Sequence, residues 1–186
     1  MTIGFALCGS YCTYDQVFPV IEALSKENKV IPILSEAAYA TDSRFGTAEH
    51  WKRKLEEICG CPPLHLISQV EPIGPKGLLD ILVIAPCTGN TLAKLAHSIA
   101  DGPVTMAAKS HLRNGRPVLV AVSTNDGLAG AGENIGRLLA RKHYYFVPFG
   151  QDDPLKKPTS LIADFAQIPQ AMEGALAGQQ IQPMLL

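Results

Sequence analysis

The chain has 186 residues, of which 47% are hydrophobic and 18% are charged, and its formal net charge is −1. This composition is typical of a folded globular protein, and the length favours one domain over two. A nearly neutral chain lacks the basic surface that nucleic acids and anionic membranes attract, so small molecules and other proteins are the expected partners.

The first predicted strand covers residues 3–8 (IGFALC), a continuous apolar run of the kind found in parallel strands that are covered on both faces. A helix is predicted at 13–25, where apolar residues recur at helical spacing. The run VIPIL at 30–34 predicts a second strand, and its Pro32 indicates an edge position or a bulge. An amphipathic surface helix is expected at 47–59.

Between residues 60 and 77, prolines and glycines surround a short apolar run, LHLIS at 64–68, that we interpret as a third strand. The run at 80–85 predicts a fourth strand. Two helices are expected next, and a fifth strand follows at 117–122. These helices are predicted at 90–100 and 103–114.

The last third of the chain predicts a helix at 133–142, a sixth strand at 144–147 and a closing helix at 159–177. We therefore expect a domain of residues 1–177, followed by a loose C-terminal tail of residues 178–186. Strands that alternate with helices at this spacing predict an α/β fold. It should be a single-domain, three-layer α/β/α sandwich around a doubly wound, mostly parallel, six-stranded Rossmann-like sheet.

Polar turns follow three of the predicted strands, at the edge where open α/β sheets bind ligands. Each turn leads towards a helix, whose amino end presents free N–H groups to an anion. Together these turns could hold a phosphate group. The candidate ligand-binding residues are Gly9, Ser10, Tyr11, Cys12, Thr13, Ser35, Thr88, Gly89, Asn90 and Thr91. The alternative for each hydroxyl is that it caps a helix and binds nothing.

Neither of the familiar nucleotide motifs is present. The first turn lacks the second glycine and the Gly-Lys-Ser/Thr ending of a Walker A loop, and it lacks the three glycines of the dinucleotide fingerprint. Nicotinamide dinucleotide bound in the usual way is therefore disfavoured.

At these same residues the sequence resembles a known superfamily. GSYCTYDQVFPVIEAL is similar to the first loop of the flavoproteins that include the cysteine-type flavin decarboxylases and the UbiX-like flavin prenyltransferases, and APCTGNTLAKLAHSIADG resembles their PASANT segment. Ser35 matches the serine that follows their second strand. The resemblance implies an FMN site. It would place the phosphate near Ser10, Thr13 and Ser35, and the ribityl and ring contacts at Thr88–Thr91.

The sequence departs from both of those enzyme classes. Ser123-Thr124-Asn125 stands near the Pro-x-Met-Asn motif of the decarboxylases, so Asn125 matches the asparagine that holds a substrate carboxylate, but the following Met-Trp and the cysteine-bearing lid are missing. The arginine that prenyltransferases carry at this point is also absent. Neither chemistry transfers directly to this chain.

The remaining branch, formed by the B subunits of dipicolinate synthases, resembles the chain along nearly its whole length, including STNDGLAGAGENIG and QDDPLKKPTSLIADF. The resemblance implies that the chain acts with an A subunit to oxidise dihydrodipicolinate to dipicolinate during sporulation. FMN would accept the hydride. The alternatives are a non-catalytic scaffold for a nicotinamide-dependent A subunit that binds NADP itself, and an independent flavin-dependent decarboxylase.

Such chemistry needs groups that hold carboxylates. Asn125 and Ser123 are the candidate catalytic residues, and Asn125, Lys156 and Lys157 are the candidate substrate-binding residues. For the two lysines the alternative is a solvated charge pair. No metal site is indicated by residue spacing.

The histidines and cysteines are weaker candidates. We expect packing or surface roles for His97 and His111, and we do not assign a catalytic role to His50. Cys12 and Cys87 lie in the ligand turns, where packing is the expected role of their thiols.

Cellular location and assembly can also be anticipated. No apolar run reaches the roughly 18 residues that a membrane span requires, and the odd number of cysteines suits a reducing compartment, so we expect a cytoplasmic protein. The resemblance implies a homo-oligomer. The helix at 103–111 is a plausible contact face.

Overall fold

The structure is a computed structural model that describes residues 1–186. Its strands form one sheet with the order β2-β1-β3-β4-β7-β6, and β5 pairs with β4 outside this path. The strands are β1 (Thr2–Leu7), β2 (Lys29–Leu34), β3 (Ile81–Cys87), β4 (Val118–Thr124), β5 (Tyr144–Phe146), β6 (Phe149–Asp153) and β7 (Lys157–Ala163).

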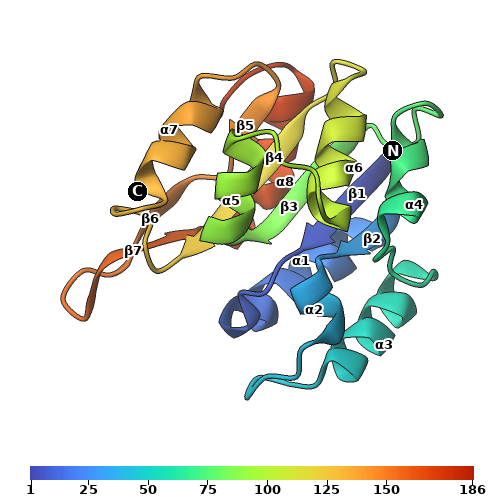
Figure 1. Cartoon of the computed structure of the whole chain (residues 1–186), viewed down its shortest axis with the longest axis horizontal. Coiled ribbons are helices and arrows are strands. Elements are labelled where there is room, and N and C mark those ends of the chain that lie inside the picture. Colours follow the sequence, from blue (N-terminus) through green and yellow to red (C-terminus); the bar gives the residue numbers. More distant parts are fainter.

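Helices cover both faces of the sheet, and Figure 1 shows α5 and α6 in front of it and α8 behind. The helices are α1 (Tyr14–Ser25), α2 (Glu36–Ala40), α3 (Ala48–Cys59), α4 (Ile67–Val70), α5 (Gly89–Ala96), α6 (Pro103–Leu112), α7 (Gly132–Leu139) and α8 (Ile168–Leu176). The predicted α/β sandwich with a mostly parallel sheet is confirmed. None of the helices combines the length and apolar composition needed to cross a bilayer.

The central strands lie in the core. Every residue of β3 is buried, as are residues 3–7 of β1 and 118–123 of β4. Side chains that point to both faces of the sheet meet helices there, which explains why these strands read as unbroken apolar runs. The expected edge position of Pro32 is confirmed, because β2 is the outermost parallel strand.

The predicted number of six strands is wrong, since the sheet has seven. The run 64–68 is not a strand: Leu64 forms a single bridge to Ile33, and α4 begins at Ile67. The predicted closing helix, 159–177, begins only at Ile168. Its first part belongs to β7, which forms an antiparallel hairpin with β6.

This hairpin is important for the site because of where it joins the sheet. β5 pairs with residues 118–120 of β4, whereas β7 pairs with Ser123 and Thr124 farther along the same strand. The β6–β7 hairpin therefore extends the sheet at the carboxyl end of β4, and in Figure 1 it projects beyond the helices.

The C-terminal tail is bound to the domain and is not loose. Phe149 donates a backbone hydrogen bond to Met184, and Leu186 donates one to Phe149. The Gln180 side chain accepts a hydrogen bond from the N–H of Phe146 and donates one to its carbonyl, each 2.7 Å long. The tail thus completes the free edge of β5.

Replacing Gln180 with alanine should destabilise the fold by about 1–3 kcal/mol, because it leaves two backbone groups of the buried Phe146 without partners. Urea denaturation would measure this as a lower transition midpoint. Gln179→Ala is the matched control, since Gln179 is exposed and should give a change close to zero. Equal midpoints for the two variants would contradict a structural role for the tail.

Candidate functional site

The turns after four parallel strands meet at one edge of the sheet and enclose two adjoining cavities. The first, here called the β2-side cavity, has a volume of about 340 Å³ and is lined by Ser35, Glu36, Asn90, Thr91, Lys94 and Thr105 among others. The second, here called the hairpin-side cavity, has a volume of about 440 Å³ and includes Ser10, Cys12, Ser123, Asn125, Asp152 and Lys157. Gly9 and Thr88 line both cavities, so they form the wall between them.

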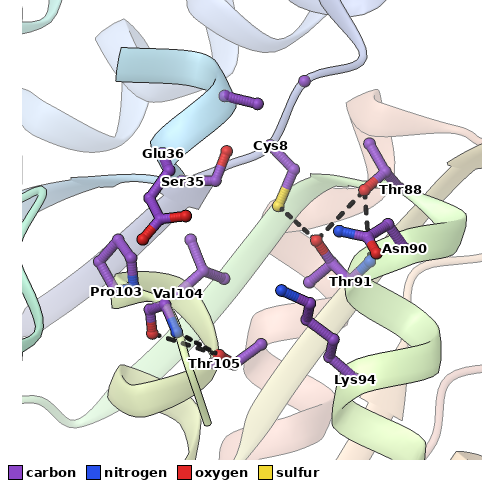
Figure 2. A pocket seen from close by; sticks show the side chains of 13 residues that line it. Cys8, Ser35, Glu36, Thr88, Asn90, Thr91, Lys94, Pro103, Val104 and Thr105 are labelled. Atoms are coloured by element: carbon purple, nitrogen blue, oxygen red, sulfur yellow. Dashed lines mark hydrogen bonds between the residues drawn. The ribbon is translucent and has the colours of Figure 1, made fainter. Parts of the chain in front are cut away.

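Hydroxyl groups of the β2-side cavity are largely committed to the protein (Figure 2). The Ser35 oxygen accepts from the N–H of Ala38, and the Thr88 oxygen accepts from that of Thr91, so both cap helices as the simpler alternative predicts. The Thr91 hydroxyl donates to the sulfur of Cys8 at 3.3 Å, so the Thr88 hydroxyl must donate in the 3.2 Å contact between the two threonines.

Several donors remain for a ligand in this cavity. The Ser35 hydroxyl keeps its proton, the backbone N–H groups of Gly89 and Asn90 at the start of α5 have no intrahelical partners, and the Asn90 side-chain amide has no partner in the chain. Lys94 adds a cation, although its ammonium pairs with Asp101 at 2.9 Å. The carboxylate of Glu36 lies across the cavity from α5 (Figure 2). The cavity therefore suits a ligand that has both an anionic group and hydroxyls.

The hairpin-side cavity joins the first turn to the end of β4. The hydroxyls of Ser10 and Ser123 lie 2.7 Å apart, and Thr13 donates to the carbonyl of Ser10. Asn125 holds Thr159 through its backbone carbonyl, and its side-chain oxygen faces the Ser160 hydroxyl at 3.5 Å. The Asn125 amide nitrogen thus remains free to donate to a ligand.

Lys157 is present in this cavity, but it is paired with an acid. Its ammonium lies 2.6 Å from the carboxylate of Asp152 across the β6–β7 hairpin, and this hydrogen bond raises the pKa of Lys157 above its ordinary value. The ion pair holds the cation in a defined position, and it also lowers the net positive charge of the cavity.

The family follows from a comparison of the whole sequence with known proteins. Residues 1–130 match the family model described as Flavoprotein. The chain belongs to the Flavoprotein family. It is 48% identical over 185 residues to the dipicolinate synthase B subunit of Bacillus subtilis (strain 168), a match that covers 99% of this chain and 92% of that protein.

Solved structures agree with this assignment. This chain superposes on a crystal structure of the dipicolinate synthase B subunit from Bacillus halodurans with a TM-score of 0.91 and 47% identity, over 100% of this chain and 95% of the other. An FMN-dependent cysteine decarboxylase, SpaF, gives a TM-score of 0.71 at 22% identity, over 95% of each chain. The second likeness supports the fold alone.

Two predicted site residues lie outside both cavities. Lys156 is in the exposed hairpin turn, where its N–H donates to Asp153. Gly89 lies behind the cavity wall, and a Cβ there would approach the Thr124 hydroxyl to 2.7 Å. The other predicted residues line one or both of the cavities, namely Gly9, Ser10, Tyr11, Cys12, Thr13, Ser35, Thr88, Asn90, Thr91, Ser123, Asn125 and Lys157.

The thiols near the site belong to two groups. Burial raises the pKa of Cys8 to about 11 and holds that of Cys87 well above its ordinary value, so both remain protonated at neutral pH. Cys87 therefore packs in the core, as expected. The packing role expected for Cys12 is wrong, because Cys12 is exposed at the hairpin-side cavity. All five cysteines are free thiols.

Three histidines considered from the sequence lie away from both cavities. His97 ends α5, His50 lies edge-on to the Trp51 ring, and His111 is buried with its Nε2 3.1 Å from the Pro117 carbonyl. No group of three His, Cys, Asp or Glu side chains could hold a metal ion.

His111 makes stability depend on pH. Burial lowers its pKa to about 4 from 6.5, so between these values the unfolded chain binds the proton more readily than the folded one. Stability should therefore fall as the pH drops below 6.5, by at most about 1.4 kcal/mol per pH unit from this group. Urea midpoints from pH 7 to 4 would show it, and His111→Gln should flatten the slope whereas His97→Gln should not.

Several residues of the site had no signal in the sequence. Glu36 and Lys94 line the β2-side cavity, and Asp152 neutralises Lys157 from a segment that carried no strand pattern. His65 also had no signal in the sequence that marked it as a site residue. Its ring stacks on that of Tyr39, with centroids 3.7 Å apart, beside an open cavity that adjoins Glu36.

Proposed function

We propose that this chain is a flavin-binding component of a dipicolinate synthase, which acts with an A subunit to oxidise dihydrodipicolinate to dipicolinate. The observation that carries the proposal is the pair of cavities that share Gly9 and Thr88 as a common wall. One cavity offers donors for a phosphorylated, hydroxyl-bearing cofactor, and the other offers an amide and a cation for carboxylates. A redox reaction needs a cofactor and a substrate in contact, and ligands bound in these two adjoining cavities would meet at the shared wall.

The residues of the β2-side cavity fit FMN. Ser35, the first N–H groups of α5 and the Asn90 amide would bind the phosphate and the ribityl hydroxyls, and Lys94 would partly balance the phosphate charge. A bound flavin supplies a ring that accepts a hydride. Membership of the Flavoprotein family supports this choice of cofactor.

The residues of the hairpin-side cavity fit a dicarboxylate. The free amide of Asn125 and the ammonium of Lys157 would each donate to a carboxylate oxygen, and the linked Ser10 and Ser123 hydroxyls would place the ring beside the wall. Asp152 keeps Lys157 from rotating into solvent. These residues would bind and orient the substrate, and Asn125 and Ser123 remain the proposed catalytic residues. The oxidation also releases a proton, which a base at the site must accept.

The name of a relative supports the proposed partners. The Bacillus subtilis relative is named as one of the subunits of a dipicolinate synthase, so the proposal includes an A subunit, which would carry any NADP site. We place the complex in the cytoplasm of sporulating cells, with this chain as a homo-oligomer. Lys156, in the exposed hairpin turn, is then free to contact a partner chain.

Purification under native conditions tests the proposal. The protein should show the visible absorption of an oxidised flavin, or acquire it when FMN is added, and dipicolinate should form only when both chains and a flavin are present. A colourless protein that does not bind FMN, yet still supports dipicolinate formation by the A subunit, would replace the proposal with the scaffold role. Release of carbon dioxide from acids by this chain alone would instead favour the decarboxylase.

A further inference from the structure

A third cavity lies outside the site described above, between the end of α5, the body of α6 and the segment that follows α7. Its volume is about 300 Å³. The apolar part of its wall includes Leu95, Ile99 and Leu112, and Ile99 is 47% exposed. A cavity with such walls favours a ligand with an apolar body.

The charged groups of this cavity are both cations. Lys109 and Arg141 line it, and no Asp or Glu does. Lys109 makes no ion pair within the chain, because the ion pairs of the structure involve other residues. An unbalanced pair of cations beside apolar walls selects an anion.

Arg141 is held in place by the protein. Its Nη1 donates to the Leu95 carbonyl and the Ser98 hydroxyl, each at 3.1 Å, and its Nη2 donates to the Ala96 carbonyl at 2.6 Å. Arginine has five N–H donors, so these three hydrogen bonds leave two for another group. Because the guanidinium is already immobilised, binding a ligand would cost little entropy at this side chain.

Tyr144 adds a hydroxyl donor to the wall of this cavity. Its side chain lines the cavity and is 9% exposed, yet its hydroxyl makes no hydrogen bond within the chain. Burial raises its pKa to about 12, so the hydroxyl is protonated and acts as a donor at neutral pH. The Tyr144 hydroxyl is open to solvent in the cavity, because Trp51 Nε1 is the only buried side-chain polar atom without a partner, so the hydroxyl can donate to a ligand.

We propose that this cavity binds a small organic carboxylate with an apolar, ring-sized body, whose carboxylate accepts from Tyr144 and Arg141 and pairs with Lys109. The site is separate from the two cavities at the sheet edge, but Thr105 lines both it and the β2-side cavity. An occupant would therefore lie one side chain away from the proposed cofactor.

Calorimetric titration of the full chain with benzene-1,3-dicarboxylate tests the proposal, together with methyl NMR spectra that locate the probe. We expect saturable binding with shifts at Leu95, Ile99 and Leu112. The neutral benzene-1,3-dicarboxamide has the same shape without the charges and should bind at least about tenfold more weakly. Inorganic phosphate lacks the apolar body and should not shift these methyl groups.

Two variants separate this site from the others. Tyr144→Phe removes one hydroxyl and should weaken probe binding about three- to tenfold, and Lys109→Gln should weaken it by a similar factor at low salt. Lys26→Gln is the matched control, because Lys26 ends α1 on the opposite face of the sheet and does not line the cavity. The Lys26→Gln variant should bind the probe with the same affinity as the unmodified protein.

Two results would overturn the proposal. Unchanged affinity in both cavity variants, with shifts confined to residues around Asn125, would place the probe in the hairpin-side cavity. If the probe fails to bind, and Ile99→Ser lowers the assembly mass measured by light scattering, the cavity is an interface between copies of the chain.

Discussion

Replacing Asn125 with alanine should slow dipicolinate formation in the two-chain assay by about 10- to 100-fold, because a hydrogen bond to a charged group contributes about 1.5–3 kcal/mol. The Asn125 amide nitrogen is free in the structure, and its oxygen makes only a long contact with Ser160. The loss should therefore fall on substrate binding and orientation. Steady-state kinetics at several substrate concentrations would measure it.

Asn134→Ala provides the control for this prediction. Asn134 is on α7, outside both cavities, and its amide makes a weak 3.4 Å contact with Gly130. It should leave the rate and the flavin content unchanged. If Asn125→Ala retains full turnover with a normal far-ultraviolet spectrum, Asn125 is not part of the substrate site.

Replacing Gly89 with alanine should weaken FMN binding at least about tenfold, although Gly89 lines neither cavity. A Cβ at this position would lie 2.7 Å from the Thr124 hydroxyl and 2.8 Å from the Asp126 carboxylate, which are hydrogen-bonded to each other. Relieving such overpacking costs about 1–3 kcal/mol and moves the start of α5, whose N–H groups face the proposed phosphate. Fluorescence titration with FMN would measure the change.

Gly136→Ala is the control, since Gly136 is also helical and a Cβ there meets no atom within 4 Å. Alanine has the higher helix propensity, so Gly136→Ala should raise stability by about 0.5–1 kcal/mol and leave FMN affinity unchanged. Equal FMN affinities in the two glycine variants would show that the start of α5 does not position the cofactor.

Three of the strands that the sequence predicted correctly share one property. β1, β3 and β4 are covered on both faces, so burial alone dictates an apolar residue at nearly every position. LHLIS at 64–68 has the same local appearance, but only Leu64 reaches β2, and the chain turns into α4. A run of apolar residues indicates burial, and it does not say which element is buried.

The β6–β7 hairpin could not be predicted for the opposite reason. Residues 149–159 are mostly polar or proline, because one face of this edge hairpin meets solvent. The sequence of this segment is therefore typical of a loop and shows no strand pattern. Its strand conformation comes from pairing with the end of β4, a contact between segments far apart in the sequence. Local propensity carries little information about such pairing.

By itself, the sequence determined the α/β fold and the set of polar turns at the carboxyl ends of the strands, because strand burial and turn chemistry are local properties. Only the tertiary structure decided how those turns are used. In the folded chain the Thr88 hydroxyl donates to Thr91, and the Thr91 hydroxyl donates to Cys8. Lys157 pairs with Asp152, and the turns at the sheet edge enclose two separate cavities. Hydrogen-bond partners and charge balance depend on which segments meet in space, and that is settled when the sheet assembles.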